Sequence, residues 1–133
     1  MIQTSVNLLA VLVAGIASFI LGGIWYAKPV FGKQWMKFSG VKMGGKNPTK
    51  AMAIGFLATL VMSYILAHFI KYTQSTTVLD GMIGGFWIWL GFVATTTLYS
   101  VIYEGKSLKL YVLNNGYNLL SLLLMGAILA VWP

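Results

Sequence analysis

The sequence predicts an all-α fold: an integral membrane four-helix bundle with a short interfacial amphipathic helix in its first cytoplasmic loop. Lysines and acids make up 8% of the 133 residues, whereas about 25% of a soluble domain is charged. Four apolar stretches follow one another along the chain, each close to the length of about 20 residues that crosses a bilayer. We therefore treat residues 1–133 as a single four-span domain.

The four predicted spans cover residues 6–27, 51–70, 81–102 and 108–132. Apart from Lys109 at the edge of the last span, none of them contains Lys, Asp or Glu. Buried helices of a soluble bundle would show a charged outward face, which these segments lack. The spans are therefore predicted to cross a membrane.

The lysines are distributed unevenly between the connections, and their distribution predicts the orientation. One lysine, Lys71, lies between the second and third spans. The other connections hold Lys28, Lys33, Lys37, Lys42, Lys46, Lys50, Lys106 and Lys109. Because cytoplasmic loops are enriched in Lys and Arg, we expect the basic loop 28–50 in the cytoplasm and both termini outside.

Three residues are candidate helix caps at the starts of the later spans. Asn47 precedes Pro48, a pairing typical of a helix N-terminus. Asp80 and Ser107 are expected to cap the third and fourth spans in the same way.

Aromatic residues are concentrated where the first span ends. Trp25 and Tyr26 form an interfacial pair, and Pro29 then ends the helix. In the following segment Phe31, Trp35 and Phe38 share one helical face, which is typical of a short helix lying in the headgroup region. We interpret these aromatic residues as an interfacial anchor, with a lipid sensor or a docking site for a partner as the alternative.

The lysines of this segment are candidate ligands of lipid headgroups. Lys33 and Lys37 lie opposite the aromatic face, and Lys28 precedes them. Membrane lipids are therefore an expected partner. Nucleic acid is not, because membrane orientation already accounts for the positive charge.

Small residues recur along three spans at helical spacing, which permits close helix packing where lipid supplies no hydrophobic force. The packing partner is another span or a second copy of the chain, and we expect a homo-oligomer to use at least one stripe. The stripes are Ala10, Ala14, Ser18 and Gly22; Ala51, Gly55, Thr59, Ser63 and Ala67; and Gly81, Gly84, Gly85, Gly91 and Thr95.

The fourth span has a polar face in an otherwise apolar segment. Amides in hydrocarbon need hydrogen-bond partners, because unsatisfied polar groups cost several kcal/mol. These residues either join the helices or line a polar groove or pore. The candidates are Asn114, Tyr117, Asn118 and Ser121, together with Thr95 and Tyr99 of the third span.

Catalytic and metal chemistry find little support in the sequence. The chain has no Cys and one His, His68, which cannot make a metal site within one chain. Asp80 and Glu104 lie at opposite ends of the third span, about 35 Å apart at 1.5 Å per residue. No nucleophile with an adjacent base is visible. We expect no metal, no cofactor and no enzymatic activity.

Gly22–Gly23–Ile24–Trp25–Tyr26 followed by Phe31–Gly32–Lys33–Gln34–Trp35–Met36 resembles the signature of a family of small prokaryotic membrane proteins, domain of unknown function 1761. Weaker similarity continues to the tail, although here Ala27 and Lys28 separate the Trp–Tyr pair from its usual proline. The resemblance implies four helices in the cytoplasmic (inner) membrane of a prokaryote, and it assigns no activity.

Three functions are consistent with these features. The first is a homo-oligomer that binds lipid or a small amphiphile at the polar face of the fourth span. The second is a passive pore for a small solute, lined by Asn114, Asn118, Ser121 and Thr95. The third is a membrane-embedded enzyme for a lipid or quinone-like substrate, with Glu104 near the inner rim.

Overall fold

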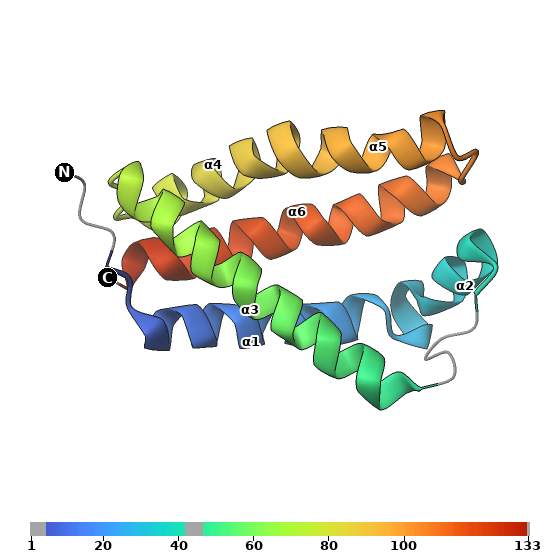
Figure 1. Cartoon of the computed structure of the whole chain (residues 1–133), viewed down its shortest axis with the longest axis horizontal. Coiled ribbons are helices and arrows are strands. Elements are labelled where there is room, and N and C mark those ends of the chain that lie inside the picture. Colours follow the sequence, from blue (N-terminus) through green and yellow to red (C-terminus); the bar gives the residue numbers. More distant parts are fainter. Residues whose placement is uncertain (1–4, 42–46, 133) are drawn as a thin grey trace.

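The computed structural model describes residues 5–41 and 47–132, and every regular element in these ranges is helical (Figure 1). Four helices are long and apolar enough to cross a membrane: α1 (Leu8–Trp25), α3 (Pro48–Tyr72), the third span (Val78–Ile102) and α6 (Leu108–Val131). They confirm the four predicted apolar helices, with ends displaced by a few residues. Lys42 and Lys46 of the basic loop lie outside the described residues.

The shorter elements complete the chain order. A π-helical turn, η1 (Lys28–Gly32), leads into α2 (Lys33–Ser39). The third span consists of α4 (Val78–Ile88), a π-helical segment η2 (Trp89–Ala94) and α5 (Thr95–Ile102).

The connections divide the molecule into two ends. At one end lie α2, the start of α3 and the turn between α5 and α6, with the described lysines of both connections; we call this the lysine end (Figure 1). At the other lie the start of α1 and the end of α6; we call this the termini end. Lys71 is at the termini end, in the last turn of α3.

Local side-chain chemistry explains where the long helices begin. Asn47 Oδ1 accepts from the Lys50 amide at 3.0 Å, and Ser107 Oγ accepts from the Lys109 amide at 3.1 Å, as predicted. The third span differs, because Thr77 rather than Asp80 is its cap and accepts from the Asp80 amide at 3.1 Å. The helix begins before Asp80, which therefore lies in the first turn.

Helix α6 is the central element of the fold. It contacts α1, α2, α3, α4, η2 and α5. In Figure 1 it runs between the third span and α1, and α3 crosses in front. The polar residues of the fourth span therefore lie on the helix that the other elements surround.

Glycines allow α4 and α6 to touch backbone to backbone near the termini end. A Cβ atom added at Gly81 would overlap the carbonyl oxygen of Gly126, and one added at Gly85 would overlap that of Leu122. Such contact is available only to glycine, and it lets van der Waals packing hold two helices together in lipid.

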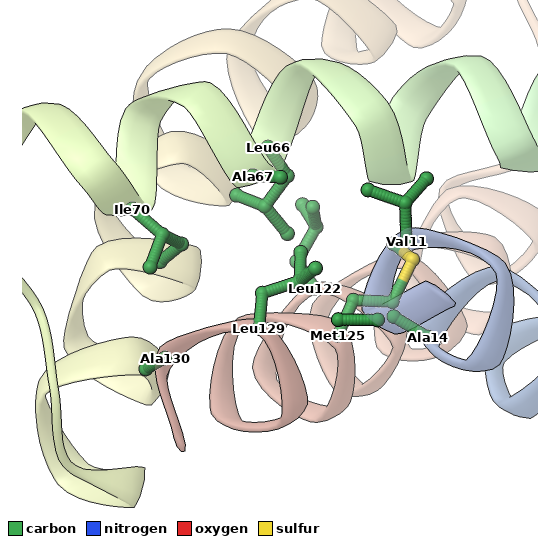
Figure 2. Packing of buried hydrophobic residues seen from close by; sticks show 10 residues of the cluster. Val11, Ala14, Leu66, Ala67, Ile70, Leu122, Met125, Leu129 and Ala130 are labelled. Carbon is green, nitrogen blue, oxygen red and sulfur yellow. The ribbon is translucent and has the colours of Figure 1, made fainter. Parts of the chain in front are cut away.

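The apolar core fills the same half of the molecule (Figure 2). Met125 of α6 is completely enclosed, and it lies among side chains from α1 and α3. The other labelled members are Val11, Ala14, Leu66, Ala67, Ile70, Leu122, Leu129 and Ala130.

Helix α3 slants across the others and covers α6 over only part of its length. Near the termini end Leu66 and Ile70 belong to the core with Leu122 and Leu129. Towards the lysine end α3 packs on α1 instead, where the Leu60 side chain lies over Gly15. Phe56 meets Phe19 edge-on there, with ring centroids 5.3 Å apart. The first half of α6 is therefore left without α3 above it.

Half of the fourteen small residues of the predicted stripes are buried within the chain. Ala10, Ala14 and Ser18 are buried, as are Ser63, Ala67, Gly81 and Gly85. A Cβ atom at Gly55 or Gly91 would meet nothing within 4 Å. Packing within the chain therefore accounts for most of the first stripe but buries only two of the five residues in each of the other two, and the homo-oligomer stays a prediction.

The π-helical segment η2 in the third span was missed by the sequence prediction. Its carbonyl groups are satisfied by hydroxyls: Thr95 donates to Gly91 at 2.7 Å, and Tyr111 of α6 donates to Ala94 at 2.7 Å. Thr97 likewise donates to Val93 at 2.6 Å. These bonds stabilise a wide turn inside an apolar helix, where free carbonyls would be costly.

A polar groove over the first half of α6 as the candidate functional site

The uncovered face of α6 forms a groove. Leu122, which α3 covers, is followed towards the lysine end by Asn118, Asn114 and Leu110 at one-turn intervals on the same side. These last three residues line a cavity of about 480 Å³. The slant of α3 therefore exposes the polar part of a face whose apolar part it covers.

The walls of this cavity come from both neighbouring spans. Tyr26 closes it on the α1 side, and Thr97 and Ser100 of α5 close it on the other. Lys106 and Ser107 lie at its mouth.

A second cavity of about 450 Å³ continues the first beneath α2. The two share Lys106, Ser107, Leu110 and Asn114. Trp35 and Phe38 of α2 give the second one an aromatic wall. We call the combined space, from Asn118 to α2, the α6 groove.

Asn114 is fixed by Tyr26, which lies just past the end of α1. The Tyr26 hydroxyl donates to Asn114 Oδ1 at 2.7 Å. Burial raises the pKa of Tyr26 above that of an exposed tyrosine, and the neighbouring Tyr117 adds to the shift. Tyr26 therefore keeps its proton, and the amide nitrogen of Asn114, a residue that lines the groove, has no hydrogen bond to another described residue.

Asn118 lies in the groove without a partner in the described ranges 5–41 and 47–132. It is half-buried, and it sits near the middle of α6, about 15 Å along the axis from the first residue of the helix. An unpaired amide at this depth keeps its full capacity to bind a ligand or water.

Asn115, one residue before Gly116, was not singled out by the sequence analysis and has a structural role. It is 4% exposed, and its Nδ2 donates to Thr97 Oγ1 at 3.0 Å and to the Tyr111 carbonyl at 3.1 Å. Trp89 of η2 donates to the Asn115 carbonyl at 3.1 Å. Tyr111 and Asn115 lie one helical turn apart in the sequence, and this spacing could have indicated a second polar face on the fourth span.

Tyr117 and Ser121 face α1 rather than the open groove. The Tyr117 hydroxyl donates to the Ser18 carbonyl at 2.9 Å, and the Ser18 and Ser121 hydroxyls are hydrogen-bonded to each other. The Tyr117 ring also packs against Gly22. Within the predicted polar face, Ser121 and Tyr117 therefore join α6 to α1, and Tyr117 does so at the edge of the groove. Asn114 and Asn118 remain available to bind a ligand.

Thr95 and Tyr99 do not line the groove, contrary to the expected grouping. Both are exposed, and Thr97 and Ser100 occupy the corresponding wall. The wide turn of η2 accounts for the difference, because extra residues in a turn rotate the following helix relative to a regular α-helix.

The aromatic residues Trp25, Tyr26, Phe31 and Trp35, which we call the aromatic corner, pack against one another and against the protein. Phe31 packs on Trp25 with ring centroids 4.5 Å apart, and Trp35 meets Tyr26 edge-on at 6.3 Å. Trp25 Nε1 donates to the Leu113 carbonyl at 3.2 Å. The corner thus ties α2 to α1 and α6.

The outer side of α2 is basic. Lys28, Lys33 and Lys37 are exposed. Phe38 lies half-buried under Lys109, whose Nζ is 5.8 Å from the ring centroid. Lysines therefore surround the groove, and Lys106 is the charged member of its described lining.

The remaining candidate groups lie away from the groove. His68 packs between Tyr64 and Tyr72, at centroid distances of 4.7 and 6.5 Å. Glu104 is exposed and does not line either cavity. Within the described part of the chain, no three His, Cys, Asp or Glu side chains could hold a metal ion together.

Comparison with known proteins places the chain in a family. No curated protein and no solved structure matches it. A family model described as "Protein of unknown function (DUF1761)" matches residues 9–130, a range that includes the aromatic corner and the α6 groove. The chain therefore belongs to the DUF1761 family, as the resemblance around Trp25 and Tyr26 indicated.

Proposed function

We propose that this protein binds a membrane lipid, or a small amphiphile of similar size, in the α6 groove. The observation that carries the proposal is Asn118, an amide with no described partner halfway along a membrane-spanning helix. An amide left unsatisfied in hydrocarbon costs several kcal/mol, so a ligand or water must bond to it in the membrane.

The surroundings of Asn118 support an amphiphilic ligand. The amides of Asn114 and Asn118 and the α5 hydroxyls supply the polar contacts, while Leu110, Trp35 and Phe38 supply apolar ones. A site with a few convergent polar groups among apolar walls is typical of small-molecule recognition.

The proposal includes a position in the membrane. The spanning helices form a four-helix bundle in the cytoplasmic (inner) membrane of a prokaryote, with the lysine end in the cytoplasm and both termini outside. Helix α2 then lies at the interface with Lys33 and Lys37 towards headgroups, and the groove opens to the cytoplasmic leaflet.

The other two functions have less support. A pore needs a polar lining across the bilayer, but the α6 face beyond Asn118 is filled by Leu122 and the fully enclosed Met125. An enzyme built around Glu104 would need that carboxylate at the groove, and it is exposed outside the lining.

A substitution that fills the groove tests the proposal. Asn118→Trp places an indole in the cavity, and Leu120→Trp makes a matched change on an exposed position of the same helix. Native mass spectrometry after release from mild detergent should show one bound lipid per chain in the wild type and in Leu120→Trp, and none in Asn118→Trp. Equal retention by both variants would contradict the proposal.

A further inference from the structure

We infer that the ligand of the α6 groove is an anionic lipid whose phosphate oxygens accept hydrogen bonds from Lys106, Asn114 and Asn118. The inference rests on the proposed function and specifies the headgroup.

The groups free to bond in the groove are mainly donors. The hydroxyl hydrogens of its polar wall are already used: Thr97 donates to Val93 at 2.6 Å, and Ser100 donates to Thr97 at 2.8 Å. Asn114 Oδ1 is occupied by Tyr26. What remains as donors are the amide nitrogens of Asn114 and Asn118, the Ser107 hydroxyl and the Lys106 ammonium, against one free amide oxygen, that of Asn118. Because donors predominate, the complementary ligand is rich in acceptors.

The charge of the groove has one sign. Lys106 is the charged residue in the described lining of both cavities, and neither Asp80 nor Glu104 of the sequence lines them. The N-terminal end of α6 also lies at the mouth, beside Ser107, and its helix dipole adds positive potential. A positively charged group of a lipid headgroup would find no negative partner in this lining. A phosphate, in contrast, would find the positive charge of Lys106.

The walls favour a lipid phosphate over a free one. The space next to Lys106 continues between Leu110 and the aromatic residues Trp35 and Phe38. A soluble anion gains nothing from these apolar surfaces, whereas the glycerol and upper acyl chain of a lipid bury area against them.

Headgroup preference provides the test. Phosphatidylglycerol and phosphatidylcholine with identical acyl chains are titrated onto the wild type, and retention is measured by native mass spectrometry. The wild type should prefer phosphatidylglycerol. Lys106→Gln should reduce that preference about fivefold, the effect expected for one lysine near anionic lipid, mainly by weakening retention of phosphatidylglycerol.

Lys50→Gln is the matched control, because it removes the same charge at the lysine end from an exposed residue outside the lining. It should leave the preference unchanged. A fivefold loss in Lys50→Gln as well would overturn the inference in favour of general surface attraction. Displacement of phosphatidylglycerol by millimolar inorganic phosphate would overturn it in favour of a soluble anion.

The inference and the proposed function fail in different ways. If the wild type retains both lipids equally, and Asn118→Trp abolishes both, the groove binds lipid without regard to charge and only the inference is overturned. If the wild type retains neither lipid, both are overturned.

Discussion

The two halves of α6 are held in the molecule by different means. Towards the termini end, glycine backbones of α4 and α6 touch and Met125 is sealed in an apolar core. Towards the lysine end, hydrogen bonds and aromatic rings tie α6 to its neighbours, and a groove remains. Because lipid supplies no hydrophobic force between helices, close packing in one half is what allows the other half to stay open.

The largest expected effect comes from breaking the close-packed half. Gly81→Ala should destabilise the protein by more than about 3 kcal/mol, because the new methyl group overlaps the Gly126 backbone and forces α4 and α6 apart. Thermal unfolding in detergent, followed by circular dichroism, measures the loss. Gly91→Ala in the same span, where the methyl group meets nothing within 4 Å, should change stability by less than about 1 kcal/mol. Equal losses in the two variants would contradict the close contact.

A smaller effect is expected in the hydrogen-bonded half. Asn115→Leu removes the amide bonds to Thr97 and to the Tyr111 carbonyl, and should lower the free energy of unfolding by about 1–2 kcal/mol. The same thermal unfolding experiment measures it. An unchanged melting temperature would show that these bonds do not hold α5 to α6.

The sequence predicted the parts of this comparison that depend on local pattern. Span length and the caps at Asn47 and Ser107 follow from neighbouring residues, and the structure has both. The orientation inferred from the lysines stays a prediction. The concentration of aromatic residues at Trp25 and Tyr26 was also evident from the sequence, and in the structure their rings contact the following segment.

The roles of individual polar residues could not be predicted in the same way. Whether Asn118 is covered depends on the slant of α3, which is set by packing on α1 far along the chain. Whether Thr95 or Thr97 faces α6 depends on the wide turn of η2, which a regular helical wheel does not include. Asn114, Asn115 and Asn118 have similar side chains in one segment, and only the tertiary structure distinguishes them.

The most direct test compares Asn115→Leu with Asn118→Leu, two identical changes less than one turn apart. Melting temperature and lipid retention by native mass spectrometry are measured on both. Asn115→Leu should lower the melting temperature and keep the bound lipid, because Asn115, although it borders the same cavity, is 4% exposed and already donates to Thr97 and the Tyr111 carbonyl. Asn118→Leu should lose the bound lipid. After lipid removal, its free energy of unfolding should match that of the wild type within about 0.5 kcal/mol, because no described hydrogen bond is broken. If Asn118→Leu were as unstable as Asn115→Leu and still retained lipid, Asn118 would be a structural residue and the groove would not be the binding site.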